Sequence, residues 1–223
     1  MKKFLETLKD MFFLLVHPYK KYKEIIQKPI SLRPLVTTVL LLFLSSTAST
    51  GYMRIRGRAV IANQDPLILN AEMMNKLQQL LEINFAQLCV SYIIMSLMSI
   101  LVVAIILNIV TALMKCQISF KQNLVLVSYS WFPMVIANIL TTVIMFVSPI
   151  EKTLFTNSIY ELILQKFIQN ATIMNLVKNI DVFYLWTLFL IAAGLQLLCK
   201  AKGIKWYIVV FLLFGLPLLF SFL

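Results

Sequence analysis

The stretch from Leu88 to Met114 reads LCVSYIIMSLMSILVVAIILNIVTALM and contains no charged residue. A helix needs about 20 predominantly apolar residues to cross the hydrocarbon core of a bilayer, which is about 30 Å thick. This stretch is long enough, and its polar residues are all neutral. It therefore predicts a membrane-spanning helix.

Similar apolar runs occur on both sides of this stretch. The weakest is near the N-terminus, where the second half of the run, 45–50, consists of small and polar residues. The chain has no long linker and no low-complexity tract. We therefore expect an all-α polytopic transmembrane helical bundle with interfacial amphipathic helices, in which residues 34–223 form one domain of about five spans. The predicted spans are about 35–53, 88–114, 124–147, 182–199 and 206–223.

The composition excludes a soluble globular protein. Hydrophobic residues make up 61% of the chain and charged residues only 13%, against roughly 45–50% and 25% in ordinary globular domains. The net charge of +11 comes from basic residues that flank the apolar runs. That placement is typical of orientation signals and of contacts with anionic lipid, so we do not expect nucleic-acid binding.

Residues 1–33 form a basic amphipathic segment that we expect to lie in the membrane surface. At helical spacing Phe4, Leu8 and Phe12 share a face opposite Glu6 and Asp10. The charges that interrupt this stretch exclude a signal peptide. His17-Pro18 breaks the first helix, and Pro18 can open a second, basic helix over 19–27. The residues expected to contact lipid headgroups or a partner are Lys20, Lys21, Lys23, Lys28 and Arg33.

Several further features of the backbone can be predicted. Gly51 and Gly57 are expected to loosen the chain after the first span, and Pro133 to kink the third. Amphipathic patterns cover 66–82 and 158–177. The first either lies on the membrane surface or extends the next span outward, because periodicity does not distinguish the two.

The distribution of basic residues predicts the orientation of the chain. Thirteen of the 20 lysines and arginines fall on the side of the N-terminus, and seven on the other side. The positive-inside rule then places the N-terminus inside and the C-terminus outside. Arg54, Arg56 and Arg58, which follow the first span, argue the other way.

The three cysteines, Cys89, Cys116 and Cys199, are odd in number and lack CxxC spacing. Neither a disulfide framework nor a redox or zinc motif is indicated. We expect them to serve as small apolar packing residues. Because Cys116 and Cys199 sit where apolar runs end, acylation is the alternative.

No catalytic chemistry can be assigned to the chain. The single histidine, His17, has no nameable partners for a metal site or a nucleophile–histidine pair. The central parts of the spans hold neutral polar residues, which either connect helices by hydrogen bonds or line a substrate path. We therefore expect no enzyme, no metal and no cofactor. The intramembrane candidates are Asn108, Asn138 and Gln196, with the kink at Pro133.

Three segments of the chain, taken in order, have a pattern found in a known family. The first is His17-Pro18-x-x-x-Tyr22-x-x-Ile25-x-x-x-Pro29 with Leu32-x-Pro34-Leu35. The others are Val127-Ser128-Tyr129-Ser130-Trp131-Phe132-Pro133, and Asp181-Val182-Phe183-Tyr184-Leu185-Trp186 with Ala193-Gly194-Leu195 behind. Together they resemble the Yip domain (Ypt-interacting protein) family of integral membrane proteins, which implies five spans and a cytosolic N-terminus.

Eukaryotic members of that family associate with Rab-type GTPases and with one another in early secretory membranes, and they carry a longer N-terminal region. The short N-terminus of this chain looks like the prokaryotic branch, which implies a cytoplasmic membrane. We expect a non-enzymatic scaffold or adaptor for membrane organisation or trafficking, in contact with lipids and with itself or a membrane-protein partner. The alternative is a small transporter, or its substrate-binding subunit, for a neutral or apolar solute.

Overall fold

The computed structural model describes residues 2–27, 31–63, 81–147, 182–201 and 203–215. Among them the secondary structure is helical and no strand occurs, so the all-α prediction is confirmed. Three helices are long and apolar enough to cross a membrane: Arg33–Ala59, Phe85–Leu113 and Phe120–Val147. Two shorter apolar helices cover Val182–Leu198 and Lys205–Phe214.

Helix α5 (Phe85–Leu113) is apolar around its whole circumference. It begins at Asn84, whose side chain accepts a hydrogen bond from the backbone N–H of Ala86 at 2.9 Å and so caps the first turn. Its buried residues, Ile100, Ala104, Leu107 and Thr111, follow one another at intervals of three or four. That spacing makes one stripe toward the bundle, and many residues of the remaining surface are exposed.

Helix α3 (Arg33–Asn63) continues past Gly51 and Gly57 without a break, so the prediction that they loosen the chain is wrong. A glycine inside a helix costs only about 1 kcal/mol. The extension is held by Arg54, whose guanidinium donates hydrogen bonds to the carbonyl oxygens of Leu81 and Ile83 at 2.9 and 2.7 Å.

The third long helix is divided into α6 (Phe120–Ser130) and α7 (Phe132–Val147). Ser119 and Gln122 form a capping box at its start. The division falls at Trp131, two residues before Pro133, which lacks the N–H that would continue the helical ladder. The predicted kink is therefore confirmed.

Helix α11 (Val182–Leu198) leads through a short turn to α12 (Lys205–Val210) and a π-helical segment, η1 (Phe211–Gly215). The turn is tied to the end of α5 by a disulfide between Cys116 and Cys199, whose Cα atoms are 5.4 Å apart. The expectation that these two cysteines are packing residues is wrong, and Cys89 is free. Because they are 83 residues apart in sequence, only the folded bundle brings them together.

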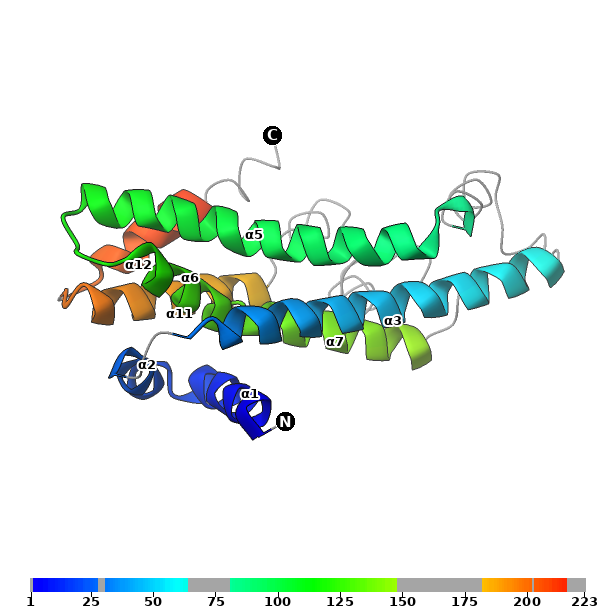
Figure 1. The fold of residues 1–223 in the computed structure, drawn as a ribbon, viewed down its shortest axis with the longest axis horizontal. Helices are drawn as coiled ribbons and strands as arrows, with labels where there is room; N and C mark the ends of the chain where they lie inside the picture. The colour runs from blue at the N-terminus through cyan, green and yellow to red at the C-terminus, as the bar shows by residue number, and fades with distance from the viewer. Residues whose placement is uncertain (1, 28–30, 64–80, 148–181, 202, 216–223) are drawn as a thin grey trace, which may run out of the picture.

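The long helices run side by side along the longest dimension of the molecule (Figure 1). Helix α3 contacts both α5 and α7, and α11 contacts α6, α7 and α12. Two helices precede α3: α1 (Lys2–Val16) and α2 (Pro18–Gln27). Figure 1 shows them on the side of the bundle opposite α5, where α1 contacts α3 and α2 contacts α11.

The predicted amphipathic stretch 158–177 and most of 66–82 lie outside the described residues, as do Lys28 and the last part of the fifth predicted span. The two described residues of 66–82, Leu81 and Glu82, are helical.

Candidate functional site: the N-terminal hairpin and its pocket

Helices α1 and α2 form a hairpin that is docked on the bundle. The break at His17 and the start of α2 at Pro18 confirm the prediction from His17-Pro18. Met11, Leu14 and Tyr22 are fully or almost fully buried. The amphipathic pattern indicated two surface helices, but it did not predict that their residues join the core.

Tyr22 anchors the hairpin deep in the bundle. Its hydroxyl lies 2.6 Å from Oγ of Ser130, near the break between α6 and α7. Its ring lies against Gly194 of α11, where an added Cβ would approach the ring to 3.2 Å and Cδ1 of Leu126 to 2.1 Å. Burial raises the pKa of the Tyr22 hydroxyl, opposed by the hydrogen bond to Ser130. Tyr22 is therefore a neutral hydrogen-bonding group.

A second contact ties the start of α2 to α11 and α12. The Tyr19 hydroxyl donates a hydrogen bond to Oε1 of Gln196 at 3.2 Å and also contacts the Tyr207 hydroxyl. The amide nitrogen of Gln196 donates to the carbonyl oxygen of Gly203 at 3.0 Å. Gln196 therefore connects the hairpin to the turn that carries Cys199.

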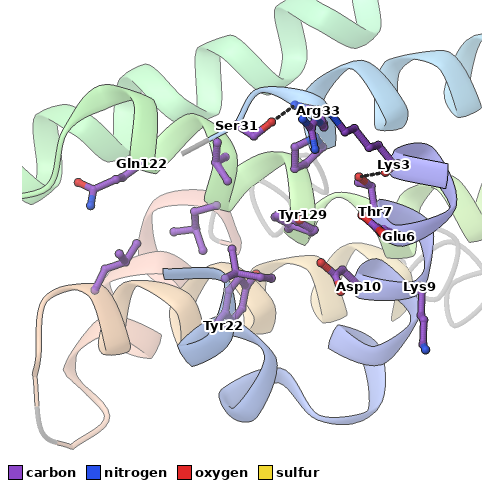
Figure 2. Close-up of a pocket in the computed structure, with 15 residues that line it drawn as sticks. Lys3, Glu6, Thr7, Lys9, Asp10, Tyr22, Ser31, Arg33, Gln122 and Tyr129 are labelled. Atoms are coloured by element: carbon purple, nitrogen blue, oxygen red, sulfur yellow. Dashed lines mark hydrogen bonds between the residues drawn. The ribbon is translucent and has the colours of Figure 1, made fainter. Parts of the chain in front are cut away.

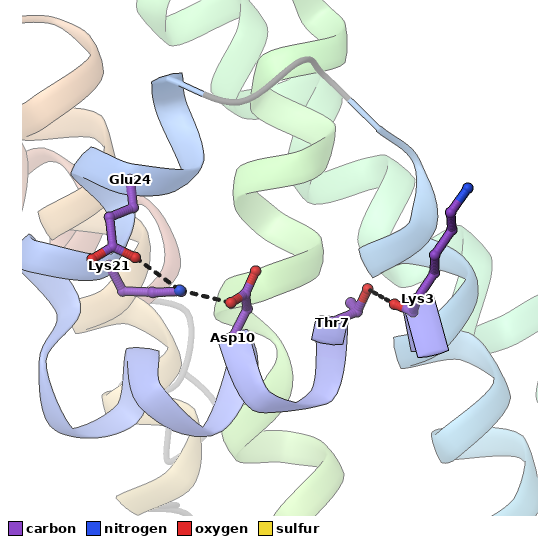
Figure 3. Close-up of polar contacts among 5 residues, drawn as sticks. All are labelled: Lys3, Thr7, Asp10, Lys21 and Glu24. Atoms are coloured by element: carbon purple, nitrogen blue, oxygen red, sulfur yellow. Dashed lines mark hydrogen bonds and ion pairs between the residues drawn. The ribbon is translucent and has the colours of Figure 1, made fainter. Parts of the chain in front are cut away.

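Lys21 holds the two arms of the hairpin together (Figure 3). Its ammonium lies 2.6 Å from the Asp10 carboxylate of α1 and 2.9 Å from the Glu24 carboxylate of α2. Only 8% of the residue is exposed. Burial disfavours the charged form, but the hydrogen bonds and charges of the two carboxylates outweigh it and raise the pKa of Lys21 above its ordinary value of 10.5.

A pocket of about 630 Å³ lies between the hairpin and the bundle. Figure 2 shows Tyr129 near its centre, Arg33 and Lys3 toward one end, and Lys9 pointing away from it. Apolar groups from α2, α6 and α11 complete the lining, among them Ile25, Val125, Leu126 and Leu198.

The two helices that face each other across the pocket contribute regular stripes. From α1 come Lys3, Glu6, Thr7 and Asp10, and from α6 come Gln122, Val125, Leu126 and Tyr129. Both sets follow the spacing of one helical face. Thr7 is almost buried, and its hydroxyl donates a hydrogen bond to the Lys3 carbonyl oxygen at 3.0 Å.

The predicted headgroup contacts fall into different environments. Lys20 and Lys23 are exposed on α2. Lys21 is instead paired with Asp10 and Glu24, and Arg33 lines the pocket. Lys28 lies outside the described residues.

The intramembrane candidates belong to separate local networks, and none of them lines this pocket. Oδ1 of Asn108 accepts a hydrogen bond from the Asn123 amide at 3.4 Å, and the Asn138 carbonyl oxygen accepts from Thr142 at 2.8 Å. Gln196 bonds Tyr19, and Pro133 is buried at the start of α7. Sequence reasoning missed Asn123, which is fully buried.

Among the described residues, no group of three or more His, Cys, Asp and Glu side chains could hold a metal ion. His17 lies beside Phe13, with ring centroids 5.1 Å apart. The lining of the pocket offers cations, hydroxyls and apolar groups.

Comparison with known proteins gives one finding. A family model described as the Yip1 domain matches residues 12–223, which is nearly the whole chain. No curated protein and no solved structure matches it significantly.

Proposed function

Because this chain belongs to the Yip1 domain family, we propose that it is a non-enzymatic membrane scaffold or adaptor of the cytoplasmic membrane, with its N-terminus inside. Family membership and the long apolar helices make it a membrane protein of the Yip type. The role in membrane organisation is the part we propose, and it includes contact with anionic lipid and with itself or a membrane-protein partner.

The observation that carries the proposal is that one side of the N-terminal hairpin is bonded to the bundle while its other sides expose lysines and an apolar side chain. One side is fixed to the bundle through Tyr22 and Tyr19. Exposed residues of the other sides include Lys20 and Lys23 of α2 and Phe12 of α1. Lysines beside exposed apolar side chains are typical of helices that contact anionic headgroups and upper acyl chains. A fixed hairpin of this kind suits a protein that organises lipid and partners rather than one that turns over a substrate.

The transporter alternative receives no support from the described residues. It required Asn108, Asn138 and Gln196 to line one solute path. The side chains of Asn108 and Gln196 instead bond Asn123 and Tyr19, and only the backbone carbonyl of Asn138 takes part in a described bond. No described pocket brings the three together, so we do not develop this alternative.

The test is native mass spectrometry of the full chain in a neutral detergent, first as extracted from its own membrane and then titrated with phosphatidylglycerol. We expect a reproducible homo-oligomer or protein partner, together with several weakly held anionic lipids. The Lys20→Gln/Lys23→Gln variant should retain fewer of these lipids. Lys121→Gln/Lys205→Gln removes two exposed lysines that belong to α6 and α12 rather than to the hairpin and serves as the charge-matched control. A monomer whose lipid retention is the same in both variants would refute the proposal.

A further inference from the structure

A stripe of polar residues on helix α1 lines the pocket, beside the buried face of the helix. Its polar residues Lys3, Glu6 and Asp10 line the pocket against α6, whereas Leu5, Phe12 and Val16 are 56%, 58% and 70% exposed. In water this arrangement would be unfavourable, but in a membrane the outward apolar side chains meet lipid. Lys3, Glu6 and Arg33 of the lining are themselves exposed, so the charged end of the pocket is open to its surroundings.

Exposed cations near a membrane surface attract anionic groups, because the headgroups of that surface carry negative charge. Part of the lining satisfies itself: the Asp10 carboxylate lies 2.6 Å from the ammonium of Lys21. Among the described residues, no ion pair involves Lys3 or Arg33. Glu6 is the remaining carboxylate of the lining, so the cations outnumber the uncompensated acids.

The placement of these charges favours an anion at one end of the pocket. Arg33 and Lys3 both lie toward that end (Figure 2). Arg33 also begins α3, whose N-terminal end carries the positive pole of the helix dipole. Guanidinium and ammonium groups together are a common setting for a phosphate, which a guanidinium can bind through two hydrogen bonds.

The rest of the pocket suits the neighbouring part of a lipid. From Gln122 to Tyr129 the lining stripe of α6 extends about 10 Å at the helical rise of 1.5 Å per residue. It starts at the first turn after the α5–α6 loop and includes Val125 and Leu126, so it runs from the headgroup level into the acyl region. The volume of about 630 Å³ lies within the range of about 300–1,000 Å³ of small-molecule sites.

We propose that this pocket is a binding site for one phosphate-bearing molecule, a phospholipid whose phosphate is held by Arg33 and Lys3 and whose glycerol region lies against the α6 stripe. This inference rests on the proposed lipid contact of the N-terminal segment and adds a single, defined site to it. A soluble phosphate ester offers the same phosphate chemistry without the acyl chains, and the test separates the two.

The experiment titrates the purified full chain, in neutral detergent, with phosphatidylglycerol, with diacylglycerol of the same chains, and with glycerol 3-phosphate. Bound molecules are counted by native mass spectrometry. We expect one phosphatidylglycerol to bind more tightly than the rest. Arg33→Gln/Lys3→Gln should weaken this one site about tenfold, the effect of losing charge-assisted hydrogen bonds. The control is Lys20→Gln/Lys23→Gln, which removes the same charge outside the pocket and should leave the site unchanged.

The Glu6→Gln variant separates loss of the site from misfolding, because it is expected to bind phosphatidylglycerol more tightly and a misfolded protein would not. Removing this carboxylate should tighten the site about two- to fivefold, in line with the modest energies of exposed ion pairs. Unchanged phosphatidylglycerol binding in the Arg33/Lys3 variant would overturn the proposal, as would equal binding of diacylglycerol. Equal binding of glycerol 3-phosphate with the same dependence on Arg33 and Lys3 would support the phosphate site and assign it to a soluble ester. Loss of only the weak lipids in the Lys20/Lys23 variant would support the adaptor proposal independently.

Discussion

Helix α5 and the α1–α2 hairpin lie on opposite sides of the bundle (Figure 1), and different forces hold them. The buried residues of α5 are almost all apolar, with Thr111 as the exception. The hairpin also buries apolar side chains, but polar links to its surroundings fix it: Lys21 to Asp10, Tyr22 to Ser130 and Tyr19 to Gln196. The position of α5 therefore rests mainly on apolar burial, with few polar links such as Asn108 to Asn123, whereas that of the hairpin depends more on individual polar contacts.

The disulfide joins the end of α5 to the turn after α11, the helix on which α2 is docked, because Cys116 follows α5 and Cys199 follows α11. Its removal should have the largest effect on stability. Closing a loop of 83 residues is worth up to about 4.5 kcal/mol in the chain-entropy model. We expect reductant to lower the melting temperature of the purified chain in detergent. Cys116→Ser should melt at the reduced temperature and no longer respond to reductant.

The same bond tests the proposed orientation. Disulfides persist in oxidising compartments and are rare in the reducing cytosol, and the proposed orientation places this end of the bundle inside. We therefore expect both thiols to be free in intact cells and the bond to form after extraction in air. Rapid alkylation of living cells, followed by mass spectrometry of the peptides, measures this. A bond already present in the cells would indicate that this end of the bundle faces an oxidising compartment, and the proposed orientation would then be wrong.

Gly194 of α11, on which Tyr22 of the hairpin packs, leaves little room for a larger side chain. In Gly194→Ala the new Cβ would lie 2.1 Å from Cδ1 of Leu126 and 3.2 Å from the Tyr22 ring, so both side chains must move. Overpacking of this kind costs about 1–3 kcal/mol. The matched control is Gly51→Ala in α3, whose nearest neighbour is a Phe85 ring atom at 3.9 Å. We expect a lower melting temperature and faster proteolysis of the hairpin in the first variant only. Equal behaviour of the two variants would contradict the packing of Tyr22 on Gly194.

Lys21 should contribute less, and its contribution should depend on pH. Lys21→Met leaves Asp10 without its closest cation, at a cost of about 1–2 kcal/mol for a pair between the exposed and fully buried limits. Because the pKa of Lys21 is raised in the folded state, its stabilisation is present at neutral pH and is lost as pH rises through that pKa. Melting curves from neutral to strongly alkaline pH should therefore converge for the wild type and the variant. The melting temperature of the exposed Lys23→Met variant should equal that of the wild type at each pH. If the wild type and Lys21→Met instead keep a constant difference in melting temperature up to strongly alkaline pH, the ion pair is not the cause of that difference.

The difference between the two regions also explains what could be predicted from the sequence. Hydrophobicity alone identifies α5 and α11, and proline chemistry locates the starts of α2 and α7, since these are local properties. The docking of Tyr22 on Gly194 and the pairing of Cys116 with Cys199 join residues far apart in sequence, so no local pattern contains them. The same holds for the pocket. Arg33 was predicted to contact headgroups because of its charge, but its position opposite the polar stripe of α1 depends on how the hairpin folds back.

The smallest expected effect gives the most direct comparison of the two regions, because each contains a tyrosine whose hydroxyl is 2.6 Å from a serine or threonine hydroxyl. Tyr22 lies 2.6 Å from Ser130, and Tyr92 of α5 lies 2.6 Å from Thr50 of α3. Removing either hydroxyl with Tyr→Phe should cost about 0.6 kcal/mol, the average for such bonds between membrane helices. Ser130 stays satisfied, since its hydroxyl also donates to the Leu126 carbonyl oxygen at 2.8 Å. The local consequence should differ: hydrogen exchange of α1 and α2 should rise in Tyr22→Phe and stay unchanged in Tyr92→Phe, because α5 keeps its apolar stripe. If both variants left exchange in the hairpin unchanged, apolar burial alone would hold it, and the proposed contrast with α5 would be wrong.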